Sequence, residues 1–591
     1  MAHESFEDTS IADILNENFI SIKVDKEERP DIDSIYMSIC VKLTGSGGWP
    51  TTIFMTPDQK PFFAGTYFPK KSRGGMIGFI DLIIYISKKW RERKEELIRT
   101  SNEILESIND AEEIEPSDSE ELIENAVRIF KNMFDKTNGG FGSAPKFPTP
   151  HNLMFLMNYY RLKDDKYILE MVEKTLIQMY KGGIFDHIGF GFSRYSTDAY
   201  FLVPHFEKML YDNALLMISY TMAYDITKKE LYSNVAEKIA IYILRELTNP
   251  DGGFYCAQDA DSDGVEGKYY VFEQEEIINL LGSDIGKKFN DYYDITKKGN
   301  FEDKNIPNLL SQKELHEDFE KYLQQIYDYR KTRTRLHLDD KILTSWNSLM
   351  ISAFAIMYRI LEKDIYLKAA ERSCRFIEEK LSDGIKLYVS YREELASGKG
   401  FLDDYAFYIY ALIHMYEAAV IDCYLERAIN LMKKAIENFF DRDNGGFYLY
   451  GHDNEQLILK PKETYDGAIP SGNSVMTYNL IKLSAIAGDS KLEEILQKQI
   501  AFMSSSAGMY LTGNSFYLLS LFMRVEPLRH VVCVLKDEKD RKNLKFPLNT
   551  NFKILCSETD EYKLINDRTT FYVCENYNCK PPTNNLEEVI K

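Results

Sequence analysis

The sequence lacks a Cys-x-x-Cys motif, although it contains eight cysteines. The closest pair, Cys574 and Cys579, has neither the spacing of a redox dithiol nor zinc-ligating neighbours. A dithiol site needs two thiols that can exchange, one of them with a lowered pKa. We therefore expect structural thiols, and no metal site.

An excess of basic residues is also missing. Lys and Arg number 72 against 92 Asp and Glu, which gives a formal net charge of -20. Nucleic-acid binding draws its affinity from clustered Lys and Arg that release counterions from phosphates. Nucleic acid is therefore not expected as a partner.

Long hydrophobic runs are absent too. No apolar stretch reaches the ~20 residues that a bilayer-spanning helix needs. The N-terminus shows no succession of basic, apolar and small residues typical of a signal peptide. We expect no membrane association and a cytoplasmic location.

What the sequence does have is ordinary globular composition in a long chain. Of its 591 residues, 44% are hydrophobic and 28% are charged. Because a single core stops growing at roughly 250 to 300 residues, at least two domains are expected.

Residues 1–112 alternate between helical and strand patterns. Ile20, Ile22 and Val24, for example, alternate with polar residues as in a strand. The predicted order is a helix at 11–19, a strand at 20–24, a helix from Pro30, a hairpin of strands at 51–55 and 61–64, and a long helix from about Met76. This succession is most of a thioredoxin-like α/β domain.

Residues 113–525 show helical periodicity almost throughout, and we expect about twelve helices. Long connections alternate with short links near residues 164, 228, 363, 423 and 489. Because short links join antiparallel neighbours, all long connections emerge at one end of the bundle. The alternation predicts an (α/α)6 toroid of six helical hairpins with one polar cleft, and a superhelical solenoid is the alternative. Several long connections begin alike, with Gly-Gly followed by an aromatic residue, as in Asn444-Gly445-Gly446-Phe447.

Residues 526–591 contain three stretches that look like strands, at 530–535, 552–556 and 570–574. They predict a small C-terminal α/β cap.

The densest group of reactive side chains lies between residues 183 and 213. A general base works best when its pKa lies near ambient pH, which suits imidazole and partly buried carboxyl groups. We therefore propose His187, His205 and Glu207 as catalytic candidates, although a lone histidine is more often structural. The same segment supplies substrate-binding candidates, which are Asp186, Arg194 and Tyr211.

A second cluster, residues 258–268, alternates carboxylates in the manner of a calcium loop. Its glycine and glutamate do not fall at the offsets that a helix-loop-helix calcium site requires, so metal is disfavoured. Asp259 is a catalytic candidate and Asp261 a substrate-binding one. The alternative is a hydrogen-bonded β-hairpin, with residues 268–271 continuing as a strand.

Further candidates stand where the inner helices are predicted to begin. Asp404 is proposed as catalytic, because paired carboxyl groups cleave glycosidic bonds. The proposed binding residues are Trp346, Asn347, Asp403, Glu463 and Asn473. Helix capping is the alternative role, and Asp404 and Ser471 are good N-cap residues.

Several segments resemble the spermatogenesis-associated protein family. They are ESFED at 4–8, VDKEERPDID at 24–33, LTGSGGWPTTIFMTPD at 43–58, FFAGTYFP at 62–69, HFEKMLYDNA at 205–214, AQDADS at 257–262 and NGGFYL at 444–449. The resemblance covers nearly the whole chain. It implies a thioredoxin-like domain at 1–112 that here lacks the family's first strand and its Cys-His-Trp-Cys motif. It also implies a six-hairpin glycosidase-like toroid at 113–525 and a cis peptide bond at Trp49-Pro50.

The leading functional hypothesis is a carbohydrate-active or carbohydrate-binding protein that takes a small polar substrate, a sugar, in the toroid cleft. Sugar epimerisation or isomerisation by histidine and carboxylate proton transfer is preferred, and glycoside hydrolysis is one alternative. A thiol-redox or chaperone-like protein that uses the thioredoxin-like domain is the other. No cofactor is expected, and the oligomeric state stays open.

Overall fold

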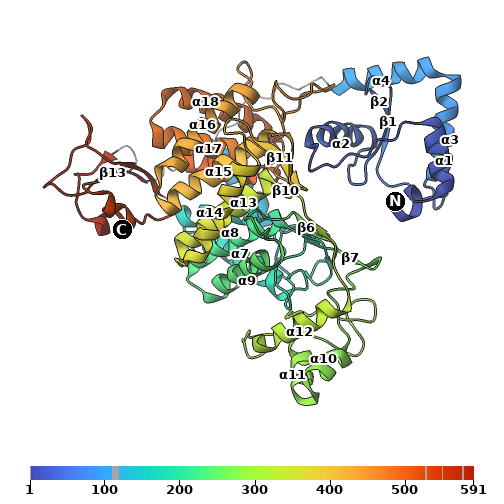
Figure 1. The fold of residues 1–591 in the computed structure, drawn as a ribbon, viewed down its shortest axis with the longest axis horizontal. Helices are drawn as coiled ribbons and strands as arrows, with labels where there is room; N and C mark the ends of the chain where they lie inside the picture. Colours follow the sequence, from blue (N-terminus) through green and yellow to red (C-terminus); the bar gives the residue numbers. More distant parts are fainter. Residues whose placement is uncertain (1, 109–118, 526–528, 549, 576–577, 591) are drawn as a thin grey trace. The chain divides into compact units, whose positions relative to one another are not determined.

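Figure 1 shows the computed structural model, which describes residues 2–108, 119–525, 529–548, 550–575 and 578–590. The chain forms two compact units. One comprises residues 1–115 with 448–462, and the other comprises residues 116–447 with 463–591.

The first unit is a β-hairpin covered by helices on both faces. Its elements are η1 (Ala2–Phe6), α1 (Thr9–Asn18), α2 (Pro30–Thr44), β1 (Thr52–Met55), β2 (Pro61–Gly65), α3 (Phe79–Glu92) and α4 (Lys94–Ile108). Ile53 and Phe54 of β1 point to opposite faces, because side chains alternate along a strand. Ile53 packs against α2, and Phe54 packs against α1 and α3. This confirms the predicted thioredoxin-like domain, and the Trp49-Pro50 peptide bond is cis.

A distant stretch of the chain completes this unit. Residues 448–462 leave the connection between two toroid helices, and Leu457 and Leu459 pack on the α2 cluster. Glu455 accepts a hydrogen bond of 3.0 Å from Arg29. The alternation of loop lengths could not predict this excursion.

The strand predicted at residues 20–24 is wrong. These residues form no strand, and Ile20 and Ile22 are 93% and 79% exposed. A strand needs a neighbour that takes its backbone hydrogen bonds, and within the described residues β1 pairs only with β2. The alternating apolar side chains therefore lie in solvent.

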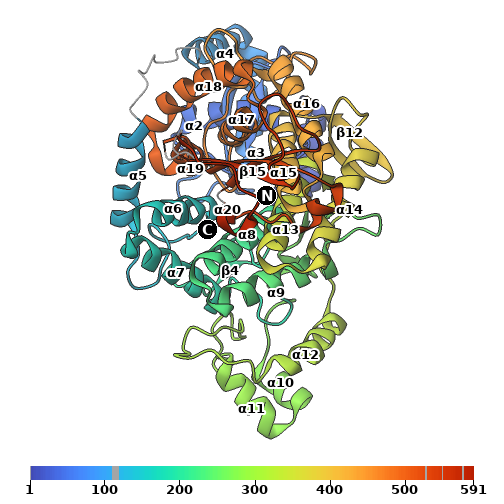
Figure 2. The same cartoon turned by 90° about the vertical axis from the view of Figure 1, so that its left-hand side faces the viewer.

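The second unit contains the predicted toroid. Its inner helices are α6 (Pro150–Lys163), α8 (Leu210–Thr227), α13 (Thr344–Leu361), α15 (Leu402–Ala419), α17 (Gly472–Ala487) and α19 (Ser515–Val525). Its outer helices are α5 (Ser119–Met133), α7 (Lys166–Lys181), α9 (Glu230–Glu246), α14 (Asp364–Lys380), α16 (Asp422–Phe439) and α18 (Ser490–Met509). Each inner helix packs on the next, and α19 packs on α6, so the ring closes as in an (α/α)6 toroid and not as in a solenoid. Figure 2 shows the outer helices around the inner ones.

Connection lengths give the ring two different ends. Two-residue links join α6 to α7, α8 to α9, α13 to α14, α15 to α16 and α17 to α18. The first residue of each link has a positive φ, between 51° at Asp164 and 65° at Gly488, which turns the chain directly after the helix. All long connections lie at the other end of the ring, which we call the loop end.

The loop end carries short strands and a helical insertion. The strands are β3 (Tyr195–Ser196), β4 (Pro204–His205), β5 (Lys208–Met209), β6 (Ala257–Gln258), β7 (Asp261–Ser262), β8 (Val265–Glu266), β9 (Leu338–Asp339), β10 (Ile342–Leu343), β11 (Tyr388–Arg392) and β12 (Leu395–Lys399). The insertion between α9 and α13 adds α10 (Gln274–Leu281), α11 (Ser283–Tyr292) and α12 (Glu320–Arg333), which stand apart from the ring in Figure 1. The predicted strand at residues 268–271 is a turn, because Tyr269 and Tyr270 fold into a buried cluster.

The predicted C-terminal cap is confirmed. Its elements are β13 (Arg529–Val534), β14 (Thr550–Leu555), β15 (Thr570–Glu575), β16 (Asn578–Cys579) and α20 (Leu586–Ile590). The strand order is β14-β13-β15-β16, with β13 parallel to β14 and antiparallel to β15. Val531 and Phe552 pack against Tyr416 of α15. Cys574 and Cys579 form a disulfide, which corrects the expectation of free thiols at these two positions.

No helix in the described part of the chain combines the length and the apolar character needed to cross a bilayer.

Candidate functional site

Three turns at the loop end share one aspartate motif. Asp135, Asp186 and Asp441 follow α5, α7 and α16, and each carboxylate accepts two backbone N–H bonds of 2.9–3.1 Å from residues two and three positions ahead. Six residues after each aspartate stands a phenylalanine that bridges back to the end of the outer helix. We call these the Asp turns, and two of them, at Asp135 and Asp441, contain the repeated Gly-Gly-Phe pattern.

An asparagine from the next inner helix secures a loop phenylalanine in three connections, two of which are Asp turns. Asn213, Asn347 and Asn473 lie in the first turns of α8, α13 and α17. Each accepts from the N–H and donates to the carbonyl of one phenylalanine, at 2.7–3.0 Å. Their partners are Phe192, Phe254 and Phe447. We call these the Asn clamps, and they occupy the amides of Asn347 and Asn473, both proposed above as substrate-binding.

Asp186 serves the scaffold in a second way. Arg330 of α12 donates two hydrogen bonds of 2.9 Å to its carboxylate, and Lys208 donates a third of 2.8 Å. Burial would raise the pKa of Asp186, but Arg330 and Lys208 hold it well below its ordinary range. Burial also lowers the pKa of Lys208 to about 8. This triad ties the insertion to the ring.

His187 lies in an aromatic core. Its ring centroid is 5.2 Å from Phe185, 5.4 Å from Tyr180 and 5.8 Å from Tyr293. Burial lowers its pKa to about 3, so the imidazole is neutral at physiological pH. His187 is 4% exposed, which favours the structural role over the catalytic one.

Asp259 and Asp261 are exposed at the root and on the first strand of the β7–β8 hairpin. Lys268 donates to Asp263 at 2.8 Å and closes the same segment. In the described residues no contact joins these aspartates to the other candidates. The geometry is that of the hydrogen-bonded hairpin alternative.

The remaining candidates fall along one continuous line, which begins before α8. Arg194 is hydrogen-bonded to Glu207, with 3.3 Å between Nη1 and Oε2, and both side chains are partly exposed. Burial works against the charge of Arg194, yet neighbouring Tyr211, Asp212 and Glu207 raise its pKa. His205 lies beside this pair on β4, where its ring stacks on Tyr195 at 5.2 Å.

The line continues into α13 through an aromatic contact. Tyr211, in the first turn of α8, lies edge-on to Trp346, with ring centroids 4.7 Å apart. The Tyr211 hydroxyl also interacts with Arg194. Both rings are buried, with 4% of Tyr211 and 7% of Trp346 exposed, so this contact joins two neighbouring inner helices beside the ion pair.

Asp404 links α13 to α15. Its carboxylate accepts from the N–H of Ser345 at 3.1 Å and of Phe401 at 2.8 Å. Helix α15 begins at Leu402, so Asp404 is a first-turn residue that reaches back and not the N-cap itself. Both oxygens are engaged and the side chain is buried, which makes Asp404 a positioning residue. By contrast, Ser471 is the N-cap of α17, as predicted.

Asp403 is the open end of the line. Its carboxylate approaches Gly472 so closely that a Cβ there would lie 2.4 Å from Oδ1, so a larger residue at this helix start would displace the carboxylate. Burial and the nearby carboxylate of Glu463 raise the pKa of Asp403 to about 7. Unlike Asp404, Asp403 is partly exposed. The line from Glu207 to Glu463, which we call the arc, thus spans the starts of four consecutive inner helices.

Two further loop-end residues are Asp466, which the sequence pattern also placed near a helix start, and His151, which it did not single out. Asp466 is buried and accepts from Ser471 and Phe516, joining the starts of α17 and α19. His151, in the first turn of α6, is fully buried, which lowers its pKa to about 4. The only available signal was their position at predicted helix starts.

Neither a metal cluster nor a dithiol is evident in the described parts of the chain. They contain no group of three or more His, Cys, Asp or Glu residues arranged to hold a metal ion. Residues 1–115 contain one cysteine, Cys40, and it is buried in α2.

The fold and the arc define a class: a thioredoxin-like unit joined to a six-hairpin toroid with an acidic, aromatic loop end. Residues 1–109 match a family described as "Protein of unknown function, DUF255". Human spermatogenesis-associated protein 20 is 32% identical over 660 residues, covering 98% of this chain and 84% of the human protein. The mouse protein is 31% identical and covers 98% and 83%. The chain belongs to the spermatogenesis-associated protein 20 family.

Several solved structures are similar to this chain at low sequence identity. Cellobiose 2-epimerase from Bacillus thermoamylovorans is 12% identical, with a TM-score of 0.45 over 69% of this chain and 99% of that one. A GH76 alpha-mannanase from Bacteroides thetaiotaomicron is also 12% identical, with a TM-score of 0.43 over 69% of this chain and 95% of that one.

Proposed function

We propose that the arc binds a carbohydrate or similar polyol and transforms it by proton transfer, with Asp403 as the group that gives or takes the proton. The observation that carries this proposal is the environment of Asp403. It is partly exposed at the loop end, faces the carboxylate of Glu463, and has a pKa of about 7. A carboxyl group with such a pKa can act as acid and as base near neutral pH.

The other members of the arc supply binding. The pair of Arg194 and Glu207 offers donors and acceptors to hydroxyl groups, and the rings of Tyr211 and Trp346 lie beside it. Asp404 keeps α13 and α15 in register, so the aromatic pair and Asp403 stay close to one another. Polar groups combined with aromatic faces suit a sugar ring better than a purely ionic ligand.

Epimerisation or isomerisation is the preferred reaction. Both begin with removal of a proton from a carbon next to a carbonyl, which a carboxyl group with a pKa near 7 can perform. Isomerisation delivers the proton to the neighbouring carbon, whereas epimerisation delivers a proton to the opposite face of the same carbon and therefore needs a second group. Glu207 and His205 are candidates for the second proton-transfer group, because Glu207 is hydrogen-bonded to Arg194 and His205 pairs with Tyr195, the next residue in the chain.

Hydrolysis of a glycosidic bond is the second candidate. The observation that favours it is the carboxyl pair of Asp403 and Glu463, since retaining and inverting glycosidases use two such groups. The two reactions leave different products, so one experiment separates them.

The test incubates the full chain in D2O with free aldoses, N-acylated aldoses and disaccharides, and follows the sugars by NMR. Epimerisation predicts a new stereoisomer with deuterium at the carbon beside the carbonyl, whereas hydrolysis predicts monosaccharides without it. Asp403→Asn should lower turnover by about 100-fold or more, the usual contribution of a general acid or base. His205→Ala tests the second group.

Asp443→Asn is the matched control, because Asp443 is an exposed loop-end aspartate in an Asp turn outside the arc. The proposal fails if no sugar is converted and none shifts the melting temperature. It also fails if Asp403→Asn and Asp443→Asn behave alike.

A further inference from the structure

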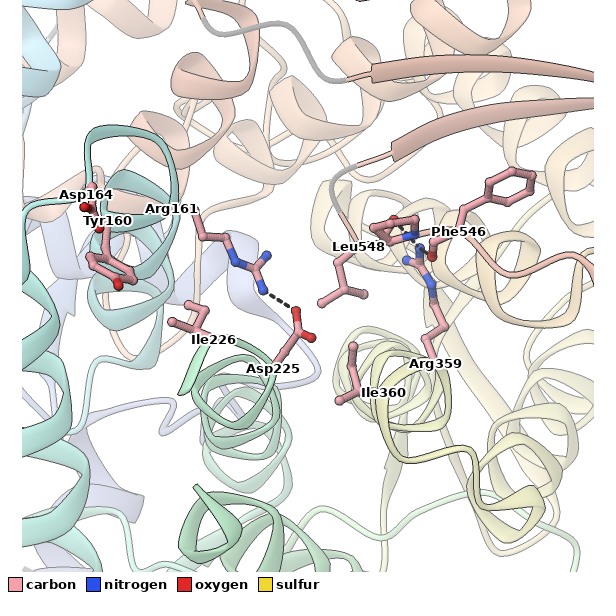
Figure 3. A pocket seen from close by; sticks show the side chains of 10 residues that line it. Tyr160, Arg161, Asp164, Asp225, Ile226, Arg359, Ile360, Phe546 and Leu548 are labelled. Atoms are coloured by element: carbon pink, nitrogen blue, oxygen red, sulfur yellow. Dashed lines mark hydrogen bonds and ion pairs between the residues drawn. The ribbon is translucent and has the colours of Figure 1, made fainter. Parts of the chain in front are cut away.

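A cavity of about 390 Å³ lies at the short-link end of the ring, away from the arc. Figure 3 shows its walls, which come from the last turns of α6, α8 and α13 and from the segment that precedes β14. Pockets for small molecules usually have volumes of roughly 300 to 1,000 Å³, so this one can enclose a small metabolite. No member of the arc lines it.

One ion pair lies inside this cavity. Arg161 donates to Asp225 through Nη2, and both side chains keep about a fifth of their surface exposed. In the part of the chain that the structure describes, Nε and Nη1 of Arg161 have no other partner, so they remain available to a second anion. Asp225 also accepts from Lys228 at 3.0 Å, and a carboxylate can accept further bonds.

The second arginine of the cavity has a different role. Arg359 donates to Glu417 at 2.6 Å and to the carbonyl groups of Phe546 and Pro547, each at 3.1 Å. It therefore holds the C-terminal segment in place as a wall. Arg161 is the guanidinium that stays open to a ligand.

The ends of three helices add an electrostatic preference. Helices α6, α8 and α13 all terminate here, and unpaired carbonyl groups give a helix C-terminus partial negative charge. A positive group is favoured beside Asp225, while a negative group is favoured at Arg161. Ile226 lies on one side of this ion pair, and Ile360 and Leu548 lie on the other side of Asp225, toward Arg359, where they supply an apolar surface.

We propose that this cavity binds a free α-amino acid with an apolar side chain. Its carboxylate takes the open donors of Arg161, its ammonium group takes Asp225 and the helix ends, and its side chain packs on Ile360 and Leu548. The site is separate from the arc and does not depend on the proposed sugar chemistry. A ligand in this cavity would contact the C-terminal ends of inner helices whose N-terminal ends carry the arc.

The experiment measures binding to the full chain by calorimetry and by thermal shift. L-phenylalanine and L-leucine are the probes, and 3-phenylpropionate and phenethylamine each lack one of the two charged groups. Because a charge-assisted hydrogen bond is worth about 1.5 to 3 kcal/mol, each analogue should bind about tenfold or more weakly. Inorganic phosphate tests for a simple anion site, and free glucose tests for a second sugar site.

Two kinds of variant complete the test. Arg161→Gln and Asp225→Asn should each lower amino-acid affinity about tenfold, and Arg375→Gln, an exposed arginine far from the lining residues, should not. Ile360→Trp fills the cavity without touching the ion pair and should abolish binding even if the charge variants fold poorly.

Three results would overturn the proposal. They are an absence of binding by both amino acids, equal binding by 3-phenylpropionate, phosphate or glucose, and unchanged amino-acid affinity in Ile360→Trp.

Discussion

The Asp turns with their Asn clamps and the arc lie at the same end of the same ring, yet they use polar side chains differently. In the turns and clamps, Asp186 and Asn473 form hydrogen bonds with backbone groups or with buried side chains. In the arc, Asp403 is partly exposed and Arg194 meets side chains that are themselves partly exposed. Position at a helix start is therefore not enough to select a candidate functional residue. Partial exposure of a polar group is the feature that separates the arc from the turns and clamps.

Asp186→Ala should give the largest effect and would show how much the turns contribute to stability. Removing this carboxylate leaves Arg330 and Lys208 buried without their shared partner, and breaking a buried pair in this way costs about 3 to 5 kcal/mol. Chemical denaturation measures the free energy of unfolding. Asp284→Ala, which removes an exposed ion pair with Lys288, is the control and should cost less than about 1 kcal/mol. Equal losses would contradict a structural role for Asp186.

Asn473→Ala should come next in size. The substitution leaves the N–H and carbonyl of Phe447 unpaired in the core, and an unsatisfied buried polar group costs about 1 to 3 kcal/mol. The control is Asn158→Ala, because Asn158 donates only to the carbonyl of Met154 in its own helix. If Asn473→Ala abolishes sugar conversion but leaves the free energy of unfolding unchanged, Asn473 belongs to the arc and not to the Asn clamps.

The architecture followed from the sequence because it depends on local signals. Helical periodicity and the alternation of link lengths predicted the closed ring, and the two-residue links fall where expected. The strand predicted at Ile20 and Ile22 was wrong for the opposite reason. A strand forms only beside a neighbouring strand, and a local sequence pattern does not show whether that neighbour exists. The excursion of residues 448–462 into the other unit is a long-range contact of the same kind.

The site was only partly predictable. Carboxylates and aromatic residues at helix starts were found, but the sequence could not distinguish Asp403 from its neighbour Asp404. That distinction rests on which carboxylate reaches the backbone of Ser345 and which one faces Glu463. The role of Asp186 was similarly hidden, because its partner Arg330 lies 144 residues away.

The pH dependence of stability tests the environment of Asp403 without any substrate. An aspartate in the unfolded chain has a pKa of about 4, whereas folding raises that of Asp403 to about 7. The folded state therefore holds a proton that the unfolded state has lost. This contribution to stability is complete below pH ~4 and disappears as the pH rises through about 7. Burial also raises the pKa of Asp404 to about 8 and that of Asp466 to about 6, so both groups add to the decline in unfolding free energy between pH 5 and 8. Asp403→Asn removes one of these three groups, so the decline should become shallower than in the unmodified chain. Asp443→Asn should leave the decline unchanged. If both variants keep the full slope, Asp403 titrates as an ordinary surface carboxylate and the arc loses its proposed proton-transfer group.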